Sequence, residues 1–204
     1  MVRNQYQAKM MRICGHEDMA SFSFNNKRER MADRAYARNT LCAECSGKVR
    51  GLIVAGAPGG FHRVSPVMMR GTPKRVTWAT QIRLEKLRKF GPVMAHLASL
   101  SEDPLARKAL AVYEMLFAVT AAVFWIDNRS PNAFCQYWLV SEIEHLSRST
   151  DLYSAHYLPS SVYGHCRKFE PALIAGARAV FVELEKVSAE ADQSAQVQMG
   201  EAAA

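Results

Sequence analysis

The sequence lacks an apolar run long enough to cross a membrane. Its most strongly apolar stretch without a charged residue, Met115–Ile126, spans 12 residues, whereas a transmembrane helix requires about 20. The first residues, Met-Val-Arg-Asn-Gln-Tyr-Gln, also lack the apolar core of a secretion signal. We therefore expect no membrane association and a cytoplasmic location.

Recognisable catalytic motifs are missing as well. The sequence contains no nucleophile elbow and no paired acidic motif. The glycine-rich stretch Gly56–Gly60 lacks the Gly-Lys-Ser/Thr ending and the following helix that a nucleotide site requires. The adjacent His165 and Cys166 would diverge on a helix, so they do not form a Cys–His couple. We expect a protein without enzymatic activity.

Cysteine is scarce, and its five copies are an odd number, which argues against a framework of disulfides. Four potential ligands nevertheless occur as two close pairs, in Cys14–His16 and Cys42–Cys45. Structural zinc is commonly bound by two such pairs of sulfur and nitrogen ligands separated by a loop. Gly15 would ease the tight turn of the first pair. We interpret Cys14, His16, Cys42 and Cys45 as ligands of one structural zinc ion.

Two other interpretations of these cysteines remain open. Cys42–Cys45 has the spacing of a redox motif, and the two groups could also be unrelated thiols in a reduced protein. The intervening segment, Glu17–Leu41, is poor in large apolar residues. Such a segment cannot bury enough surface to fold alone, which favours a metal cross-link.

Positive charge is concentrated in the N-terminal part of the chain. The net charge is +7; residues 1–75 contain 14 Lys/Arg and 5 Asp/Glu, whereas residues 76–204 contain 12 and 14. A basic metal-binding module can contact phosphates and release counterions, so we expect contact with DNA or RNA. A solvated basic face without a partner is the alternative. The candidate contact residues are Arg28, Arg30, Arg34, Arg38, Lys48 and Arg50. Arg30, Arg34 and Arg38 have the spacing of one stripe on a helix.

The patterns divide the chain into four parts and predict an α+β protein. We expect a zinc-binding basic head over residues 1–50, similar to a zinc ribbon, and a connector rich in glycine and proline over 51–71. A mainly α-helical bundle should follow over 72–189, and a disordered tail over 190–204. Polar and apolar residues alternate over Ser21–Phe24, which predicts a strand, and the apolar run Leu52–Ala55 is predicted to form a last strand of the head. Arg28–Asn39 reads as a helix whose Met31, Ala35 and Tyr36 face the metal.

Helix starts in the bundle are predicted by a capping side chain followed by proline. This pair occurs at Thr72-Pro73, Asp103-Pro104 and Ser130-Pro131. The expected helices cover residues 72–90, 93–100, 105–126 and 132–149, with 105–126 buried at the centre because it is apolar nearly all round. Residues 151–159 should be irregular.

A last helix should begin near Pro171. Its apolar residues follow the spacing of a coiled-coil seam: Leu173, Ala177, Val180, Leu184 and Val187. This seam could pack within the bundle or pair with a second copy, so the protein is expected to be a monomer or a dimer through this helix.

Several motifs occur in an order that resembles a known group of proteins. They are the two ligand pairs, then Gly71-Thr72-Pro73-Lys74-Arg75 leading to Trp78-Ala79 and Ile82-Arg83, and finally Phe124-Trp125-Ile126-Asp127-Asn128-Arg129. The sequence resembles zinc-ribbon-headed proteins of phages, plasmids and other mobile elements over about residues 14–130. It departs at Arg75, where glutamine is usual, and at Phe124, where tryptophan is usual. The resemblance implies zinc and an origin in a mobile element, but no activity.

Two hypotheses of function follow. The first is a non-enzymatic, zinc-binding accessory protein of a mobile genetic element that contacts nucleic acid through its basic head. The alternative is a protein-interaction module, for example in anti-defence or regulation, that binds a host or plasmid protein through its helical body while its zinc is purely structural.

Overall fold

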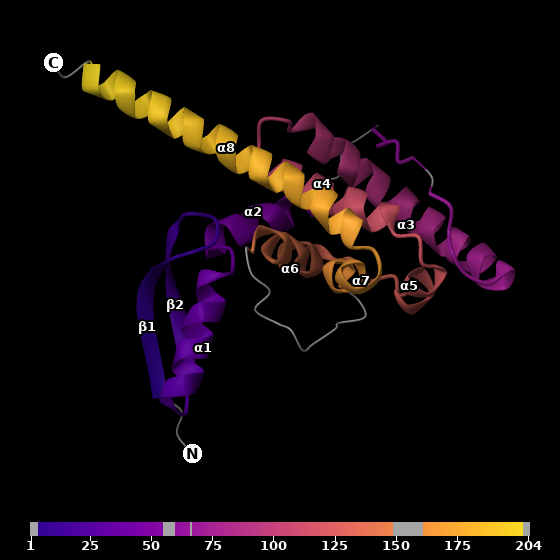
Figure 1. Ribbon diagram of the computed structural model, residues 1–204, viewed down its shortest axis with the longest axis horizontal. Helices are drawn as coiled ribbons and strands as arrows, with labels where there is room; N and C mark the ends of the chain where they lie inside the picture. Colours follow the sequence, from indigo (N-terminus) through magenta and orange to yellow (C-terminus); the bar gives the residue numbers. More distant parts are fainter. Residues whose placement is uncertain (1–3, 55–59, 66, 149–160, 202–204) are drawn as a thin grey trace.

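An antiparallel hairpin and one helix form the first unit of the structure. The computed structural model describes residues 4–54, 60–65, 67–148 and 161–201, with side chains up to Val187. β1 (Asn4–Met11) pairs with β2 (Glu17–Phe24), and α1 (Lys27–Arg38) packs against β2 (Figure 1). Successive side chains of a strand point to opposite faces, so apolar residues at every second position of β1 and β2 point toward α1. The small core of this unit contains Met10, Ala20, Phe22 and Ala37.

The inward face of α1 differs from the prediction. We expected Met31, Ala35 and Tyr36 to face the metal, but Met31 is 63% exposed and Tyr36 is 46% exposed. The residue that α1 buries is Ala37. The reason is that α1 packs on the hairpin rather than on the cysteines, and the aromatic and apolar residues of the strands select another side of the helix.

Helices make up the rest of the described chain, so the predicted α+β class is confirmed. Their bounds are α2 (Ala43–Val54), α3 (Pro73–Ser99), α4 (Pro104–Ala118), α5 (Ala122–Asp127), α6 (Gln136–Ser147), α7 (Val162–Phe169) and α8 (Pro171–Glu201). The predicted last strand over Leu52–Ala55 is wrong as far as Val54, which ends α2. Within the described residues, no helix is both long and apolar enough to span a bilayer.

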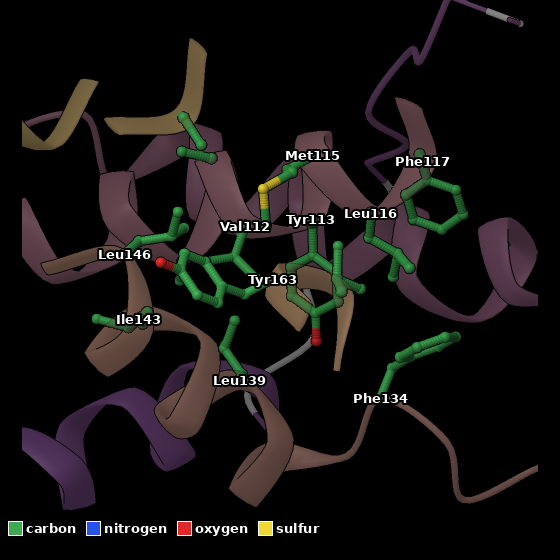
Figure 2. Packing of buried hydrophobic residues seen from close by; sticks show 14 of the residues in the cluster. Val112, Tyr113, Met115, Leu116, Phe117, Phe134, Leu139, Ile143, Leu146 and Tyr163 are labelled. Atoms are coloured by element: carbon green, nitrogen blue, oxygen red, sulfur yellow. The ribbon is translucent and has the colours of Figure 1, made fainter. Parts of the chain in front are cut away.

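The main core is organised around α4, as its apolar sequence predicted. This helix packs against α3, α6 and α8. Figure 2 shows side chains of α4, among them Val112 and Tyr113, directed toward Leu139 and Ile143 of α6. All four are fully buried. Burying each such side chain contributes about 1.5–3 kcal/mol, so these contacts account for much of the stability of the body.

The three predicted helix starts have different outcomes. Asp103 caps α4 by accepting from the N–H groups of Leu105 and Ala106, and Thr72 precedes α3 without a side-chain hydrogen bond. Ser130-Pro131 does not start a helix, because the backbone carbonyls of both residues accept hydrogen bonds from lysines of α3. These contacts hold the segment as a turn, and α6 begins at Gln136.

The helix predicted over 105–126 is broken into α4 and α5. Between them the N–H of Thr120 donates to the carboxylate of Glu170 at 3.2 Å, and its carbonyl accepts from Arg70 N at 2.7 Å. The indole N–H of Trp125 donates to the carbonyl of Val119 at 3.1 Å. Tertiary partners therefore satisfy backbone groups that a continuous helix would have paired internally.

The opposite error occurs in α3, which we expected to end before Pro92. The helix continues through Pro92 to Ser99, and a neighbouring segment packs against it beside the proline. His62 N donates to the carbonyl of Gly91 at 3.1 Å, and the ring of Phe61 lies where a side chain at position 91 would be. Residues 60–65 and 67–71 of the predicted connector thus lie against the helical body rather than forming a free linker.

α8 begins at Pro171 as predicted, but its buried face is shifted from the predicted seam. Ile174, Ala177, Phe181 and Leu184 are buried, whereas Val187 is 53% exposed. The face packs within the chain, against α4, α6 and α7. The disordered tail predicted from residue 190 also differs from the structure, where α8 continues to Glu201 beyond the other helices (Figure 1). The alanine, glutamine and glutamate content of this stretch suits a helix. Residues 151–159, predicted to be irregular, lie outside the described residues.

A buried carboxylate joins α6 to the start of α7. Glu142 accepts from the N–H of Val162 at 3.1 Å and from the N–H of Tyr163 at 2.7 Å. Its side chain therefore caps α7 from another helix. Burial raises the pKa of Glu142 to about 7, although hydrogen bonds from the α7 backbone oppose the shift.

The raised pKa of Glu142 predicts a pH dependence of stability. The folded state binds a proton more tightly than the unfolded state, so stability falls as pH rises from the ordinary glutamate value through about 7. Relative to Glu142→Gln, which does not titrate, the wild type should lose free energy of unfolding on the order of 3 kcal/mol between about pH 5 and pH 8. Urea unfolding of both proteins at several pH values measures this difference. A difference that stays constant with pH would contradict it.

Candidate metal centre

The first two candidate ligands lie in the loop that closes the hairpin. Arg12 N donates to the carbonyl of His16 at 2.9 Å, and Gly15 N donates to the carbonyl of Arg12 at 3.0 Å. Gly15 has a φ of 76°, in the left-handed region that glycine adopts without strain. This tight loop turns the side chains of Cys14 and His16 to the same side.

The other two ligands lie at the N-terminus of α2. Cys42 directly precedes the helix, and its sulfur accepts from the N–H of Cys45 at 3.3 Å. The sulfur of Cys14 accepts from the N–H of Cys42, also at 3.3 Å. A free N–H group at a helix start favours negative charge, and the N–H of Cys42 favours the thiolate of Cys14 in this way.

The ligand atoms of Cys14, His16, Cys42 and Cys45 all lie within 4.8 Å of one another. His16 Nδ1 is 3.2 Å from the sulfur of Cys45 and 3.8 Å from that of Cys42. Ligand atoms of a tetrahedral zinc site are separated by about 3.8 Å, given metal–sulfur distances of about 2.3 Å. All four cysteine and histidine side chains can therefore reach one ion. The thiols are free rather than joined in a disulfide.

The surroundings shift the pKa values of the Cys14 and Cys45 thiols in opposite directions. Burial raises the pKa of Cys45 to about 12, with additional contributions from Cys42 and Cys14. Burial also opposes ionisation of Cys14, but hydrogen bonds from the backbone of Cys42 and His16 outweigh it and lower the pKa of this thiol. Three crowded thiols cannot all ionise without a cation, and a bound metal ion supplies the charge that deprotonates them.

A second layer of polar contacts fixes the two ligand pairs relative to each other. Asp18 of β2 accepts from the N–H of Ala43 at 3.1 Å, which caps α2, and from Arg12 at 3.3 Å. Arg12 also donates to the carbonyl of Ala37 at 2.8 Å and to the hydroxyl of Thr40 at 2.9 Å. Hydrogen bonds of this kind orient metal ligands and raise metal affinity.

The helical body also holds the segment that leads into α2. Leu41 N donates to Glu144 of α6 at 2.9 Å, and Arg148 donates to the carbonyl of Asn39 at 3.0 Å. Cys45 and Val49 belong to the main core rather than to the hairpin core. The predicted boundary at residue 50 therefore differs from the structure: Cys42 and Cys45 belong to the main core, and Cys14 of the hairpin loop packs against the same core.

Arg30, Arg34 and Arg38 lie at the predicted spacing on α1, and the six candidate nucleic-acid residues have different surroundings. The guanidinium of Arg30 lies 4.5 Å from the ring centre of Tyr6, so this side chain packs on the hairpin. Lys48 pairs with Glu44 at 2.8 Å, and Arg50 donates to the carbonyl of Ser46. Among the described residues, the remaining three form no ion pair: Arg28, Arg34 and Arg38.

The sequence reasoning missed Asp18, Arg12 and Glu144, which support the site. Each acts through a contact between segments distant in the sequence, so local spacing carries no signal for it. Comparisons with family models, with curated proteins and with solved structures find no match to this chain.

Proposed function

We propose that the protein is a non-enzymatic, zinc-binding accessory protein that contacts nucleic acid through α1. Three thiols and one imidazole form a soft donor set, which suits zinc better than the oxygen-seeking calcium and magnesium ions. The role of the ion is structural, since four protein ligands fill a tetrahedron and leave no position for substrate.

The observation that carries the nucleic-acid proposal is the unbalanced charge of α1. Elsewhere in the first unit, the acidic side chains are occupied: Glu17 pairs with Lys9, and Asp18 pairs with Arg12. On α1, Glu29 is held by hydrogen bonds from Asn25 and Asn26 in the N-terminal cap. Asp33, the other acidic residue of α1, forms no ion pair among the described residues, so basic residues outnumber acidic ones five to two on this helix and the arginines at positions 28, 34 and 38 remain available to phosphate groups.

The association with a mobile genetic element rests on the resemblance described above. The motifs of that resemblance occupy the metal loop, the start of α3 and the segment around α5. They support a common origin, and we propose an accessory role on that basis. A purely structural zinc with a protein partner is the second candidate, favoured by a groove between β2 and α1, which lies in the hairpin unit and not in the helical body where we expected the contact.

We predict that the triple variant Arg28→Glu/Arg34→Glu/Arg38→Glu binds nucleic acid at least about 100-fold more weakly than the wild type, because phosphate contacts are replaced by repulsion. Fluorescence anisotropy with labelled single- and double-stranded DNA and RNA measures the loss. Wild-type affinity should fall steeply between about 50 and 200 mM salt, and the slope should be smaller in the variant.

The matched control reverses three exposed basic residues of the body, Lys74, Arg75 and Arg88. This triple changes the net charge by the same amount but leaves α1 intact. Equal weakening by both triples would contradict a specific role of α1, as would affinity that does not depend on salt.

A further inference from the structure

One edge of the hairpin is open to pairing. The hairpin closes with Arg12 N donating to His16 O, and bonded pairs alternate with non-bonded pairs along an antiparallel ladder. The register therefore places Ser21 and Ser23 in non-bonded pairs, with their backbone N–H and C=O groups directed away from β1. Among the described residues, these backbone groups have no other partner. Arg12 Nη2 lies 3.5 Å from the carbonyl of Met19 on the same edge, in agreement with this alternation.

A groove of about 260 Å³ runs between this edge and α1. β2 lies between β1 and α1 in the fold (Figure 1). Phe22 and Ala37 are buried beneath the groove, while Ser21 and Ser23 are exposed on the strand side. The helix side contributes Asp33 and Tyr36 together with Thr40 at one end. An open strand edge beside a helix is the arrangement in which an extended peptide adds as another strand.

The charges that line the groove indicate the chemistry of the occupant. Arg12 is already paired with Asp18 and bonded to the backbone of α1. Asp33 forms no ion pair among the described residues, so the uncompensated charge in the groove is negative. A lysine or arginine side chain complements this carboxylate, whereas a phosphate group does not.

We infer that this groove binds an extended segment of a partner protein as an added strand on β2, with a basic side chain placed beside Asp33. Backbone hydrogen bonds to Ser21 and Ser23 provide affinity that is largely independent of sequence, and the carboxylate selects for positive charge. This site is distinct from the basic residues at positions 28, 34 and 38, and it goes beyond the proposed contact with nucleic acid.

The probe is a mixture of fluorescent, end-blocked heptapeptides with arginine at the centre and valine, threonine or tyrosine elsewhere. The full-length protein, purified under reducing conditions without chelator, should bind it saturably in an anisotropy titration. A mixture with N-methyl groups on alternate residues should not bind, because it cannot donate to the strand edge. Replacing the central arginine with glutamate should weaken binding roughly three- to fivefold.

Ser21→Pro tests the edge directly, since it removes an N–H that faces away from β1 and proline is tolerated at such positions. Gln7→Pro is the matched control: Gln7 is the register partner of Ser21 on β1, and its N–H faces the opposite edge. We expect Ser21→Pro to weaken peptide binding roughly tenfold and Gln7→Pro to leave it within about twofold of the wild type. Asp33→Asn should abolish the preference for arginine over glutamate without touching the strand.

Several results would overturn the proposal. They are a lack of saturable binding by the arginine mixture, equal weakening by both proline variants, and equal binding of the N-methylated mixture. An oligonucleotide that displaces the peptide, and whose own affinity falls equally in Ser21→Pro, would assign the groove to nucleic acid instead. Ser21→Pro is uninformative if it contains less metal than the wild type or has a weaker circular dichroism signal. In that case Asp33→Asn and the N-methylated mixture decide whether the groove binds the peptide as an added strand.

Discussion

Cys14→Ala should reduce the metal content from about one ion per chain to nearly none and unfold the hairpin unit. Three remaining ligands leave the ion open to water, and the small core of Met10, Ala20, Phe22 and Ala37 cannot order the unit alone. Structural zinc contributes apparent binding free energies of about 10 kcal/mol or more in small domains. Elemental analysis measures the metal, and hydrogen exchange of the β1 and β2 amides measures the order.

Cys135→Ala is the matched control, because Cys135 is exposed and lies outside the ligand cluster. It should retain both the metal and the exchange protection of the hairpin. The main core should survive in both variants, so circular dichroism should show that most of the helix content is kept. Wild-type protein that contains no metal after reducing, chelator-free purification would contradict the metal centre itself.

Glu142→Ala should strongly destabilise the helical body. It leaves the N–H groups of Val162 and Tyr163 buried without an acceptor and opens a cavity between α6 and α7. An unsatisfied buried group costs about 1–3 kcal/mol, so the free energy of unfolding should fall by about 3 kcal/mol or more. Urea denaturation followed by circular dichroism measures the change.

The control for this substitution is Glu85→Ala. Glu85 is exposed on α3, and a change there should alter stability by less than about 0.5 kcal/mol. A loss below about 1 kcal/mol in Glu142→Ala would show that water replaces the carboxylate as the acceptor. In that case Glu142 would not be the group that fixes the start of α7.

Sequence spacing was sufficient for the parts of the site that are local. Cys14 and His16 flank a glycine in a tight loop, and Cys42 and Cys45 lie one turn apart at a helix start, so the structure brings the predicted ligands together. Spacing could not reveal that the second pair lies on a helix of the main core. That arrangement depends on the contact between Leu41 and Glu144, which are 103 residues apart in the sequence.

Helix boundaries could be predicted where the capping group is adjacent in the sequence. The predictions were wrong where the partner is distant in the sequence. Asp103 caps its own helix, and that start is confirmed. The break at Thr120 depends on Glu170, and α3 continues through Pro92 where the distant segment that contains His62 packs against it. The contact between Thr120 and Glu170 satisfies a backbone N–H that local sequence would leave unpaired.

The supply of the ligands by two segments, the hairpin loop and the start of α2, has a kinetic consequence. Cys42 and Cys45 are buried, so we expect a chelator to reach these two ligands only after the hairpin loop moves away from α2. The rate of metal loss should then become independent of chelator concentration and equal the frequency of this opening. The rate of metal release would then measure how often the hairpin loop separates from α2, without any label on the protein.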